Sequence, residues 1–221
     1  METPMTKKRL GDISKITGGQ ITSRLEKKEI DDLFEIVRES DKPKITCEAL
    51  VLVPRAISNG FVDKSSLMKI VCEKETKKEL DATDLTSFVD ESKITKADTL
   101  VLKLSTPYDA CVITKDDENL IVSSFCASLT LTDKDVDLLY VLAFLNSKLY
   151  QDQIKDLAAG SAIPLISVGA IENVQIPLPS KEEQEQIGKD FINTMKKIKL
   201  INKVIALESE KMNSIFYGME G

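Results

Sequence analysis

The chain of 221 residues contains no histidine, and this absence removes several classes of active site. Without imidazole there is no Ser-His or Cys-His nucleophile pair, and the commonest general base is missing. Zinc sites that include histidine are excluded, and the four cysteines are widely spaced with no Cys-x-x-Cys pair. The sequence therefore predicts no metal site and no cofactor, and its cysteines suit buried thiols in a reducing cytosol.

Recognisable catalytic motifs are missing as well. Gly18-Gly19 lacks the third glycine and the preceding strand pattern of a cofactor loop, and the chain has neither a P-loop nor a Pro-Pro dipeptide. Carboxylates and lysines occur at nuclease-like spacings, but such spacings arise by chance in a chain with 30% charged residues. We therefore predict that the chain is not an enzyme by itself and that its function is binding.

No stretch of the sequence is long and apolar enough to span a membrane. The longest apolar run, Leu138–Leu145, is far shorter than the roughly 20 residues that a transmembrane helix needs. Met1–Arg9 is polar and basic with no apolar segment after it, so no secretory signal is expected. The sequence predicts a cytoplasmic protein with no membrane partner.

Positive charge is scarce for a chain that would bind nucleic acid. The net charge is −6, and arginine occurs only at positions 9, 24, 38 and 55. From Lys181 onward lysines and acidic residues balance, so the negative excess lies in the first 180 residues. This is the wrong sign for a DNA-reading domain, so DNA contact would need a local basic patch on an acidic body.

The sequence from Ser180 to Tyr217 predicts one long helix. Pro177 and Pro179 keep the preceding chain extended, and Ser180 with Glu183 forms a capping box. Two series of residues then recur every seven positions, as the a and d positions of a helix that lies against another helix do. At ~1.5 Å per residue the helix would be roughly 55 Å long, more than its own domain needs. The series are Phe191, Ile198, Ile205, Met212 and Ile187, Thr194, Ile201, Glu208, Ile215.

The alternative is a surface helix packed on its own domain. Polar d residues, Thr194 and Glu208, interrupt the stripe, and Gly188 weakens the first turns. The length and the repeat together favour pairing between chains. The predicted interface consists of Ile187, Phe191, Ile198, Ile201, Ile205, Met212 and Ile215.

Strand patterns cluster in the middle of the chain. Two of them, Ala110–Thr114 and Leu120–Phe125, flank a charged run and predict a hairpin. Asn59-Gly60 predicts a tight turn, of type I′ or a related kind. The other strand candidates are Ala49–Val53, which Pro54 stops, Leu67–Cys72, Thr99–Leu104 and Ala127–Leu131.

Helical patterns surround these strands. Thr132 with Asp135 indicates a helix start, and an apolar stripe follows from Val136 to Ile154 with a break near Asn146-Ser147. Leu10–Ile16 fits a helical turn or an irregular strand, and Leu25–Arg38 fits a helix or a strand. We predict an α+β fold, in which a domain of residues 1–180 with a central mixed or antiparallel sheet and flanking helices precedes a long C-terminal coiled-coil helix, residues 181–221.

Six segments carry a resemblance through their order and spacing: Lys103–Ala110, Ser123–Cys126, Leu139–Ser147, Gly160-Ser161-Ala162, Ile176–Pro179 and Gln184–Ile187. Together they resemble the specificity subunits of type I restriction–modification systems. In that family a target recognition domain ends in a Gly-Ser turn and an Ile-Pro-x-Pro segment, and a long helix follows. The resemblance covers most of the chain, from about Leu10 to the end of the helix.

The resemblance implies a protein that reads DNA and leaves catalysis to other subunits. A complete specificity subunit carries two recognition domains and two long antiparallel helices that act as a spacer. This chain looks like a half-length form, so two copies would pair through their helices and read a symmetric, interrupted site. The implied partners are double-stranded DNA, an adenine methyltransferase subunit, a restriction (translocase–nuclease) subunit and a second copy of the chain.

Three loops offer side chains of the kinds that read base edges. Such reading needs Arg, Lys, Asn, Gln, Ser or Thr on loops held by a rigid sheet. Because arginine is scarce, Arg24 and Arg55 are the first candidates, although each also fits an ordinary surface residue. The predicted DNA-binding residues are Gln20, Ser23, Arg24, Arg55, Asn59, Lys64, Ser105, Thr106 and Tyr108.

A function of a different class also fits the acidic composition. A truncated interaction or regulatory protein would pair with a full-length specificity subunit, or with the methyltransferase, without reading DNA. The two functions differ in whether a methylated DNA motif depends on Arg24 or Arg55.

Overall fold

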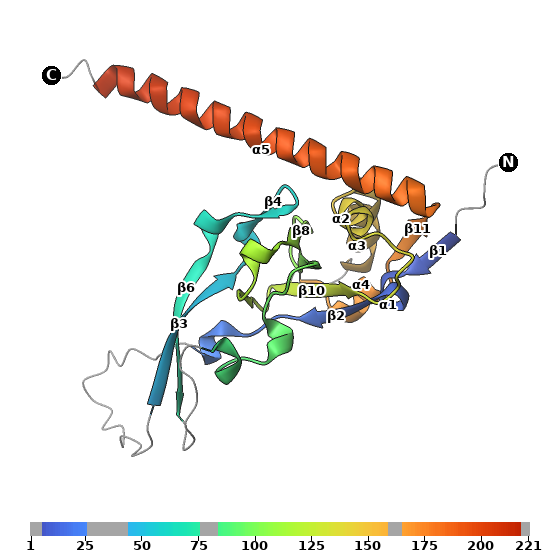
Figure 1. The fold of residues 1–221 in the computed structure, drawn as a ribbon, viewed down its shortest axis with the longest axis horizontal. Helices are drawn as coiled ribbons and strands as arrows, with labels where there is room; N and C mark the ends of the chain where they lie inside the picture. The colour runs from blue at the N-terminus through green and yellow to red at the C-terminus, as the bar shows by residue number, and fades with distance from the viewer. Residues whose placement is uncertain (1–5, 26–43, 76–83, 159–164, 218–221) are drawn as a thin grey trace.

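The structure is a computed structural model that describes residues 6–25, 44–75, 84–158 and 165–217. It has the predicted α+β fold, with antiparallel sheets, one mixed sheet, short helices and a long C-terminal helix, α5 (Lys181–Tyr217). Figure 1 shows α5 running along one side of a body formed by the preceding residues. The sequence predictions for residues 26–38 and for Gly160-Ser161-Ala162 lie outside the described residues.

A four-stranded antiparallel sheet forms the centre of the body. The third strand of this sheet is β7 (Thr99–Lys103). Its side chains point alternately to the two faces of the sheet and so enter two different hydrophobic cores. Leu100 and Leu102 pack with the helices, and Val101 packs toward a second sheet. Burial on both faces explains why this strand is a continuous apolar run. The strand order is β2 (Ser14–Gly18), β10 (Cys126–Leu131), β7 (Thr99–Lys103) and β8 (Ala110–Ile113).

A second sheet has the order β6 (Met68–Glu75), β3 (Lys44–Leu52) and β9 (Ile121–Val122). β3 is antiparallel to β6 and parallel to β9, and it ends just before Pro54 as predicted. Two short strands, β4 (Ile57–Ser58) and β5 (Phe61–Val62), form a hairpin. Its turn residues Asn59 and Gly60 have φ angles of 53° and 77°, the positive pair that a type I′ turn requires.

Short helices cover the face of the central sheet that Leu100 and Leu102 occupy. The N-terminal strand β1 (Thr6–Arg9) pairs with β11 (Gln175–Leu178), so the two ends of the body meet beside the start of α5 (Figure 1). The helices are α1 (Leu10–Ile13), α2 (Leu138–Leu145), α3 (Lys148–Ala158) and α4 (Val168–Glu172). Short 3₁₀ turns are η1 (Thr22–Arg24), η2 (Pro54–Ala56), η3 (Lys64–Ser66), η4 (Leu85–Ser87), η5 (Glu91–Lys93) and η6 (Lys115–Asp117).

The capping box at the start of α5 is confirmed. The backbone N–H of Ser180 donates to the Glu183 carboxylate at 3.0 Å, and the N–H of Glu183 donates to the Ser180 hydroxyl at 3.4 Å. These bonds satisfy two donors that a helix start otherwise leaves unpaired. They fix where α5 begins and therefore the direction in which it leaves β11.

Two sequence predictions about local structure are wrong. β8 and β9 do not form a hairpin, because β8 pairs with β7 while β9 pairs with β3 in the other sheet. The helix expected to start at Thr132 starts later, where the Asp137 carboxylate accepts the N–H of Tyr140 at 2.8 Å and caps α2. The predicted break at Asn146-Ser147 is confirmed, since it separates α2 from α3.

Candidate nucleic-acid interface

Five of the nine predicted DNA-binding residues lie on segments that leave the central sheet at the same end. Strands β2 and β7 flank β10, with Gly18 and Leu102 both opposite Ala127, so their carboxyl ends share one edge. The five residues are Gln20, Ser23 and Arg24 after β2, and Ser105 and Thr106 after β7. The register therefore brings together two loops that are some 80 residues apart in the sequence.

A tight turn, Ser123–Cys126, lies between these two loops and holds them in place. The N–H of Ser124 donates to the carbonyl of Gln20 at 2.8 Å, and the N–H of Leu104 donates to the carbonyl of Phe125 at 2.9 Å. The turn itself is closed by the N–H of Cys126 and the carbonyl of Ser123 at 2.8 Å. We call the surface formed by residues 18–25, 104–107 and 123–126 the sheet-end surface.

Gly19 explains why the first loop approaches this turn so closely. A Cβ atom at Gly19 would lie 2.0 Å from the Ser123 carbonyl oxygen, so only glycine fits. The far end of the loop is fixed as well, because the N–H of Glu73 in β6 donates to the carbonyl of Leu25 at 2.8 Å. The sequence showed the glycine pair but not this contact, which depends on a segment about 100 residues away.

The second loop is closed at its base by an ion pair. The buried Lys103 ammonium lies 3.0 Å from the Asp109 carboxylate, and the Lys103 N–H donates to the Asp109 carbonyl at 2.9 Å. The N–H of Ile166 donates to the carbonyl of Leu104 at 2.8 Å. Ser105 and Thr106 are therefore presented on a short, clamped loop, as side chains that read bases must be.

The sheet-end surface contains no acidic residue, although the chain has 36 of them. The acid-free stretch continues through β10 as far as Thr132. Arg24 is exposed, and within the described ranges no carboxylate is paired with it. Lys93 lies next to this surface, because its ammonium donates to the carbonyl of Gly18 at 2.5 Å, but Asp90 and Glu91 on the same turn balance its charge. A surface with an exposed arginine and no carboxylate of its own is the local patch that DNA contact would need on an acidic body.

Three other predicted residues lie on the connection between β3 and β6. The Arg55 Nε–H donates to the carbonyl of Ser66 at 3.1 Å and so braces this connection. The Lys64 ammonium donates to the carbonyl of Asp116 at 2.9 Å and lies 3.8 Å from the Asp117 carboxylate. Asn59 occupies a left-handed position that its turn requires. Each of the three has a structural role that accounts for its residue type.

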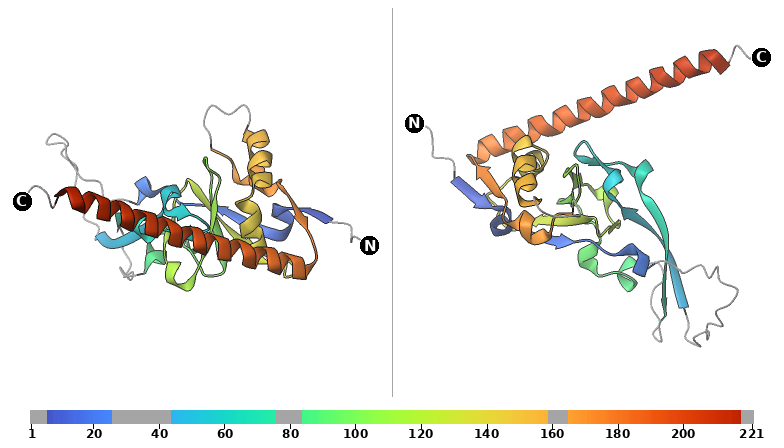
Figure 2. Two further views of the ribbon diagram at one scale, coloured as in Figure 1. Left: turned by 90° about the horizontal axis from the view of Figure 1, so that it is seen from above. Right: turned by 180° about the vertical axis from the view of Figure 1, so that it is seen from behind.

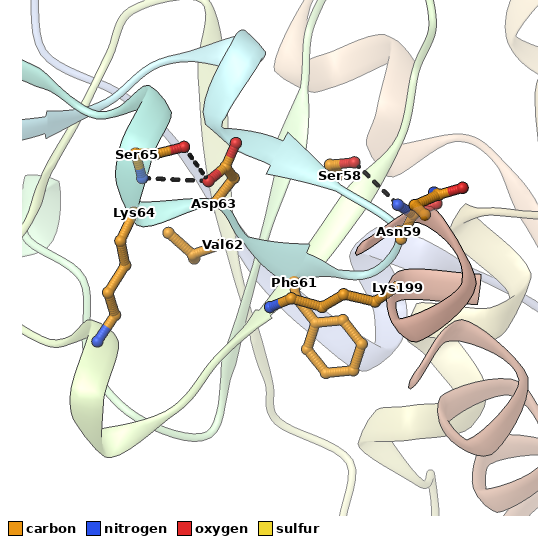
Figure 3. Close-up of a pocket in the computed structure, with 9 residues that line it drawn as sticks. Ser58, Asn59, Phe61, Val62, Asp63, Lys64, Ser65 and Lys199 are labelled. Carbon is orange, nitrogen blue, oxygen red and sulfur yellow. Dashed lines mark hydrogen bonds between the residues drawn. The ribbon is translucent and has the colours of Figure 1, made fainter. Parts of the chain in front are cut away.

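Asn59 and Lys64 line a cleft of about 550 Å³ between the β4–β5 hairpin and α5. Figure 3 shows the Lys199 side chain of α5 lying over the Phe61 ring, and the ammonium is 5.6 Å from the ring centroid. A hydrogen bond from Ser65, and another from Ser66, hold the pKa of Asp63 below its usual value. The cleft marks the point where α5 passes the last element of its own body.

The prediction that Tyr108 binds DNA is wrong. Its side chain is only 4% exposed and belongs to the main hydrophobic core. The loop polarity suggested a surface position, but the chain turns inward at Tyr108, where the Gln151 amide donates to its carbonyl at 3.1 Å. A side chain so buried does not reach DNA, so Tyr108 is a core residue.

Phe125, the residue at the centre of the sheet-end surface, is not among the DNA-binding residues that the sequence predicts. Its ring is 50% exposed, and among the aromatic side chains that the structure describes it alone is exposed. An aromatic residue within a Ser-Ser-Phe-Cys turn between two short strands was the available signal. Exposure of the ring is a property of the folded chain, so the sequence alone did not indicate it.

The first half of α5 packs on its own body. Gln184 and Gly188 are buried against the start of α2, and a Cβ atom at Gly188 would lie 2.7 Å from the Cβ of Leu139. The predicted interface residue Phe191 is half-buried near the β4–β5 turn, and Ile198 is half-buried on the same side of the helix. These two a positions therefore have partners within the chain.

The second half of α5 is exposed on all sides. Every described side chain from Lys199 to Ile215 is exposed, and the helix projects past the β4–β5 hairpin (Figure 2). Ile187, in the first half, is exposed too. The exposed apolar residues of the second half are the predicted Ile201, Ile205, Met212 and Ile215, together with Leu200, Val204 and Leu207.

The described residues contain no group of three or more His, Cys, Asp or Glu side chains that would hold a metal ion. Burial raises the pKa of the Cys126 thiol to about 12, so this thiol stays protonated at neutral pH. None of the described helices combines the length and the apolar character needed to cross a bilayer.

Comparison with known proteins gives one family. Residues 2–209 match the family described as the type I restriction modification DNA specificity domain. A stretch of 90 residues is 38% identical to the type I restriction enzyme MjaVIII specificity subunit of Methanocaldococcus jannaschii, covering 38% of this chain and 21% of that protein.

Two solved structures share the fold. The HsdS subunit from Thermoanaerobacter tengcongensis superposes with a TM-score of 0.58 at 14% identity, over 96% of this chain and 47% of that chain. A chain from a study of complex assembly and conformational transition of the type I R-M system superposes with a TM-score of 0.60, with the same identity and coverage. The chain thus spans about half the length of these structures and about a fifth of the curated relative.

Proposed function

The chain belongs to the family of type I restriction modification DNA specificity domains, and we propose that it is a subunit that binds one half-site of an interrupted DNA target. Residues 1–180 would form the target recognition domain, and residues 181–221 the spacer helix. The subunit would be non-catalytic and would act in the cytoplasm. An adenine methyltransferase subunit and a restriction (translocase–nuclease) subunit would supply the chemistry.

The sheet-end surface supports the DNA-reading part of this proposal. Gln20, Ser23, Ser105 and Thr106 present amide and hydroxyl groups of the kinds that hydrogen-bond to base edges. They stand on loops that backbone hydrogen bonds fix to a rigid sheet. Arg24 provides an exposed cation, and no carboxylate in these segments would repel phosphate. We place Arg55, Asn59 and Lys64 second, because their contacts within the body already explain them.

The difference between the two halves of α5 is the single observation that supports assembly of two chains into a dimer. Its first half is packed in cis, while its second half exposes seven large apolar side chains to solvent. A heptad helix with an unpaired apolar face is the geometry of a coiled-coil partner. Two copies related by a two-fold axis would bury these faces against each other and place two recognition domains at a fixed separation.

The proposal is tested by mapping methylated adenines. The chain is co-expressed with the adenine methyltransferase subunit of its own type I system, and the DNA of the host is sequenced for modified adenines. A symmetric, interrupted motif is expected, because a two-fold protein matches a palindrome. Arg24→Ala should abolish or relax this motif, whereas Arg55→Ala should change it less. Methylation without any motif, or no methylation by a complex that assembles, would contradict the proposal.

The acidic charge of the body favours a second candidate function. With a net charge of −6, the chain would act as an interaction protein that pairs with a full-length specificity subunit or the methyltransferase without reading DNA. The same experiment separates the two functions. A stable complex that produces no new methylated motif supports the interaction protein.

A further inference from the structure

Phe125 is placed where a reading surface would present an apolar contact. It is one of the two central residues of the Ser123–Cys126 turn, and its ring is 50% exposed. The loop with Gln20 is bonded to one side of this turn, and the loop with Ser105 follows Leu104, which is bonded to the other side. Phe125 therefore lies on a turn between the two loops that carry the hydrogen-bonding side chains proposed for the interface.

The turn that carries Phe125 is held from both flanks. Its backbone is bonded to Gln20 at 2.8 Å and to Leu104 at 2.9 Å, and the N–H of Gly19 donates to the carbonyl of Cys126 at 2.9 Å. The N–H of Phe125 also lies 3.4 Å from the Ser123 hydroxyl oxygen. A turn whose backbone is fixed in this way loses little backbone freedom when its side chain contacts a ligand, which favours specific recognition.

The chemistry around the ring favours DNA over a protein partner. None of the three segments of the sheet-end surface carries a carboxylate, whereas the chain as a whole is acidic. In the major groove the thymine 5-methyl group is the apolar feature of a base edge, and apolar side chains such as phenylalanine contact it. Exposed Ile21 on the neighbouring loop widens the apolar centre of the surface.

We propose that Phe125 is a specificity-determining residue that places its ring against the 5-methyl group of a thymine in each half-site. This rests on the proposed function, because it requires the sheet-end surface to face the major groove. Gln20, Ser105 and Thr106 would then read the neighbouring base edges by hydrogen bonds. Phe125 contributes an apolar preference that none of these side chains provides.

The test uses the chain co-purified with the adenine methyltransferase subunit of its own type I system. Motifs are selected from a duplex DNA pool with randomised half-sites, for the wild type, Phe125→Ala and Phe125→Leu. Phe125→Ala should lose the preference at one A·T position in each half-site and keep the rest of the motif. Its affinity for the wild-type site should fall by about tenfold, and that of Phe125→Leu by less.

A chemical probe on the DNA identifies the contact. Replacing that thymine by uracil removes only the methyl group and should weaken the wild type by about fourfold, the value for one buried methyl group. Phe125→Ala should bind thymine and uracil duplexes equally well. The control is Leu149→Ala, which removes another exposed apolar side chain, on α3, and should leave motif and affinity unchanged.

Three outcomes overturn the inference. The motif and affinity of Phe125→Ala could equal those of the wild type, or the uracil effect could be the same in both proteins. Alternatively, Phe125→Ala could release the methyltransferase while the motif persists, which would assign the ring to a protein contact. If the wild type selects no motif at all, the proposed function itself fails. A clear wild-type motif that Phe125→Ala leaves unchanged overturns only the role of Phe125.

Discussion

The two halves of α5 carry one heptad repeat but have different surroundings. In the first half, Phe191 and Ile198 face the chain's own body, and Gly188 allows α2 to approach the helix backbone. In the second half, Ile205 and Met212 occupy the same a positions of the repeat and are exposed. The repeat therefore indicates which side of a helix is apolar, but not whether the chain itself or a second chain covers it.

The largest expected effect comes from substitutions in the second half of α5 alone. Ile201→Asp with Ile205→Asp should weaken dimerisation by about 1,000-fold or more, because burying an unpaired carboxylate costs several kcal/mol. Both side chains are exposed in the single chain, so at a concentration low enough to dissociate the wild-type dimer the variant and the wild type should unfold at the same temperature. Sedimentation equilibrium measures the first effect and circular dichroism the second.

The control for this pair is Ala206→Asp, which adds charge to another face of the same exposed segment. It should leave the dimer intact. If the double variant unfolds at a clearly lower temperature than the dissociated wild type, the second half has contacts within the chain and the comparison fails.

The next largest effect comes from a substitution in the first half of α5, where the helix packs against α2. At Gly188 a Cβ atom would lie 2.7 Å from the Leu139 Cβ and 2.9 Å from the Asp137 carboxylate. Gly188→Ala should therefore lower the free energy of unfolding by about 1–3 kcal/mol, although alanine favours a helix by about 1 kcal/mol over glycine. Denaturant unfolding measures this loss.

Gly169→Ala is the matched substitution, because a Cβ atom at Gly169 in α4 meets nothing within 4 Å. It should be neutral or slightly stabilising. If Gly188→Ala stabilises the protein by the same amount, the close contact between α5 and α2 is wrong.

An effect of similar size concerns the hydrogen bonds of the first half. Gln184 is 4% exposed. Its side-chain carbonyl oxygen accepts the backbone N–H of Asp137 at 3.0 Å, and its side-chain NH₂ group donates to the backbone carbonyl of Pro179 at 3.0 Å. Gln184→Leu leaves both backbone groups unpaired and should cost about 1–3 kcal/mol of unfolding free energy. Gln186→Leu, on an exposed face, should cost less than about 0.5 kcal/mol. Equal losses for the two would show that Gln184 does not join α5 to the body.

The smallest effect lies at the boundary between the halves. The Asp63 carboxylate has a lowered pKa, mainly through the hydrogen bond from Ser65, with a further contribution from the Lys199 charge on α5. Since its folded pKa lies below the ordinary 3.8, its contribution to stability is present above pH 3.8 and is lost as the pH falls through the folded value.

Lys199→Met should raise the pKa of Asp63 slightly, as measured by NMR titration, while Lys203→Met should leave it unchanged. Lys199→Met should also remove the weak contact between Lys199 and the Phe61 ring, worth about 0.5–1 kcal/mol at most. An Asp63 pKa that does not respond to Lys199→Met would place the second half of α5 farther from the hairpin than the structure does.

Local signals in the sequence predicted local structure well. The Ser180–Glu183 capping box, the strand that Pro54 ends and the Asn59-Gly60 turn depend on neighbours within a few residues, and all three are confirmed. The hairpin between Ala110 and Phe125 failed because β9 pairs with β3, which lies some 70 residues earlier. Pairing across such distances is set by packing, which periodicity does not record.

The same limit applies to the candidate site. Gln20 and Ser105 were selected by residue type, and the register of β2, β10 and β7 places both at one sheet end. Tyr108 was selected by the same criterion but is buried, and Phe125 was passed over but is exposed. Gly188, which weakened the predicted helix, is the residue that its contact with α2 requires.

The solution mass of the wild-type chain tests the central claim most directly. Each chain has a mass of 24.5 kDa, so sedimentation equilibrium at tens of micromolar should give twice this value, about 49 kDa. Ile201→Asp with Ile205→Asp should return it to 24.5 kDa. A wild type that stays at 24.5 kDa at this concentration would contradict the assignment of the second half of α5 to pairing between identical chains.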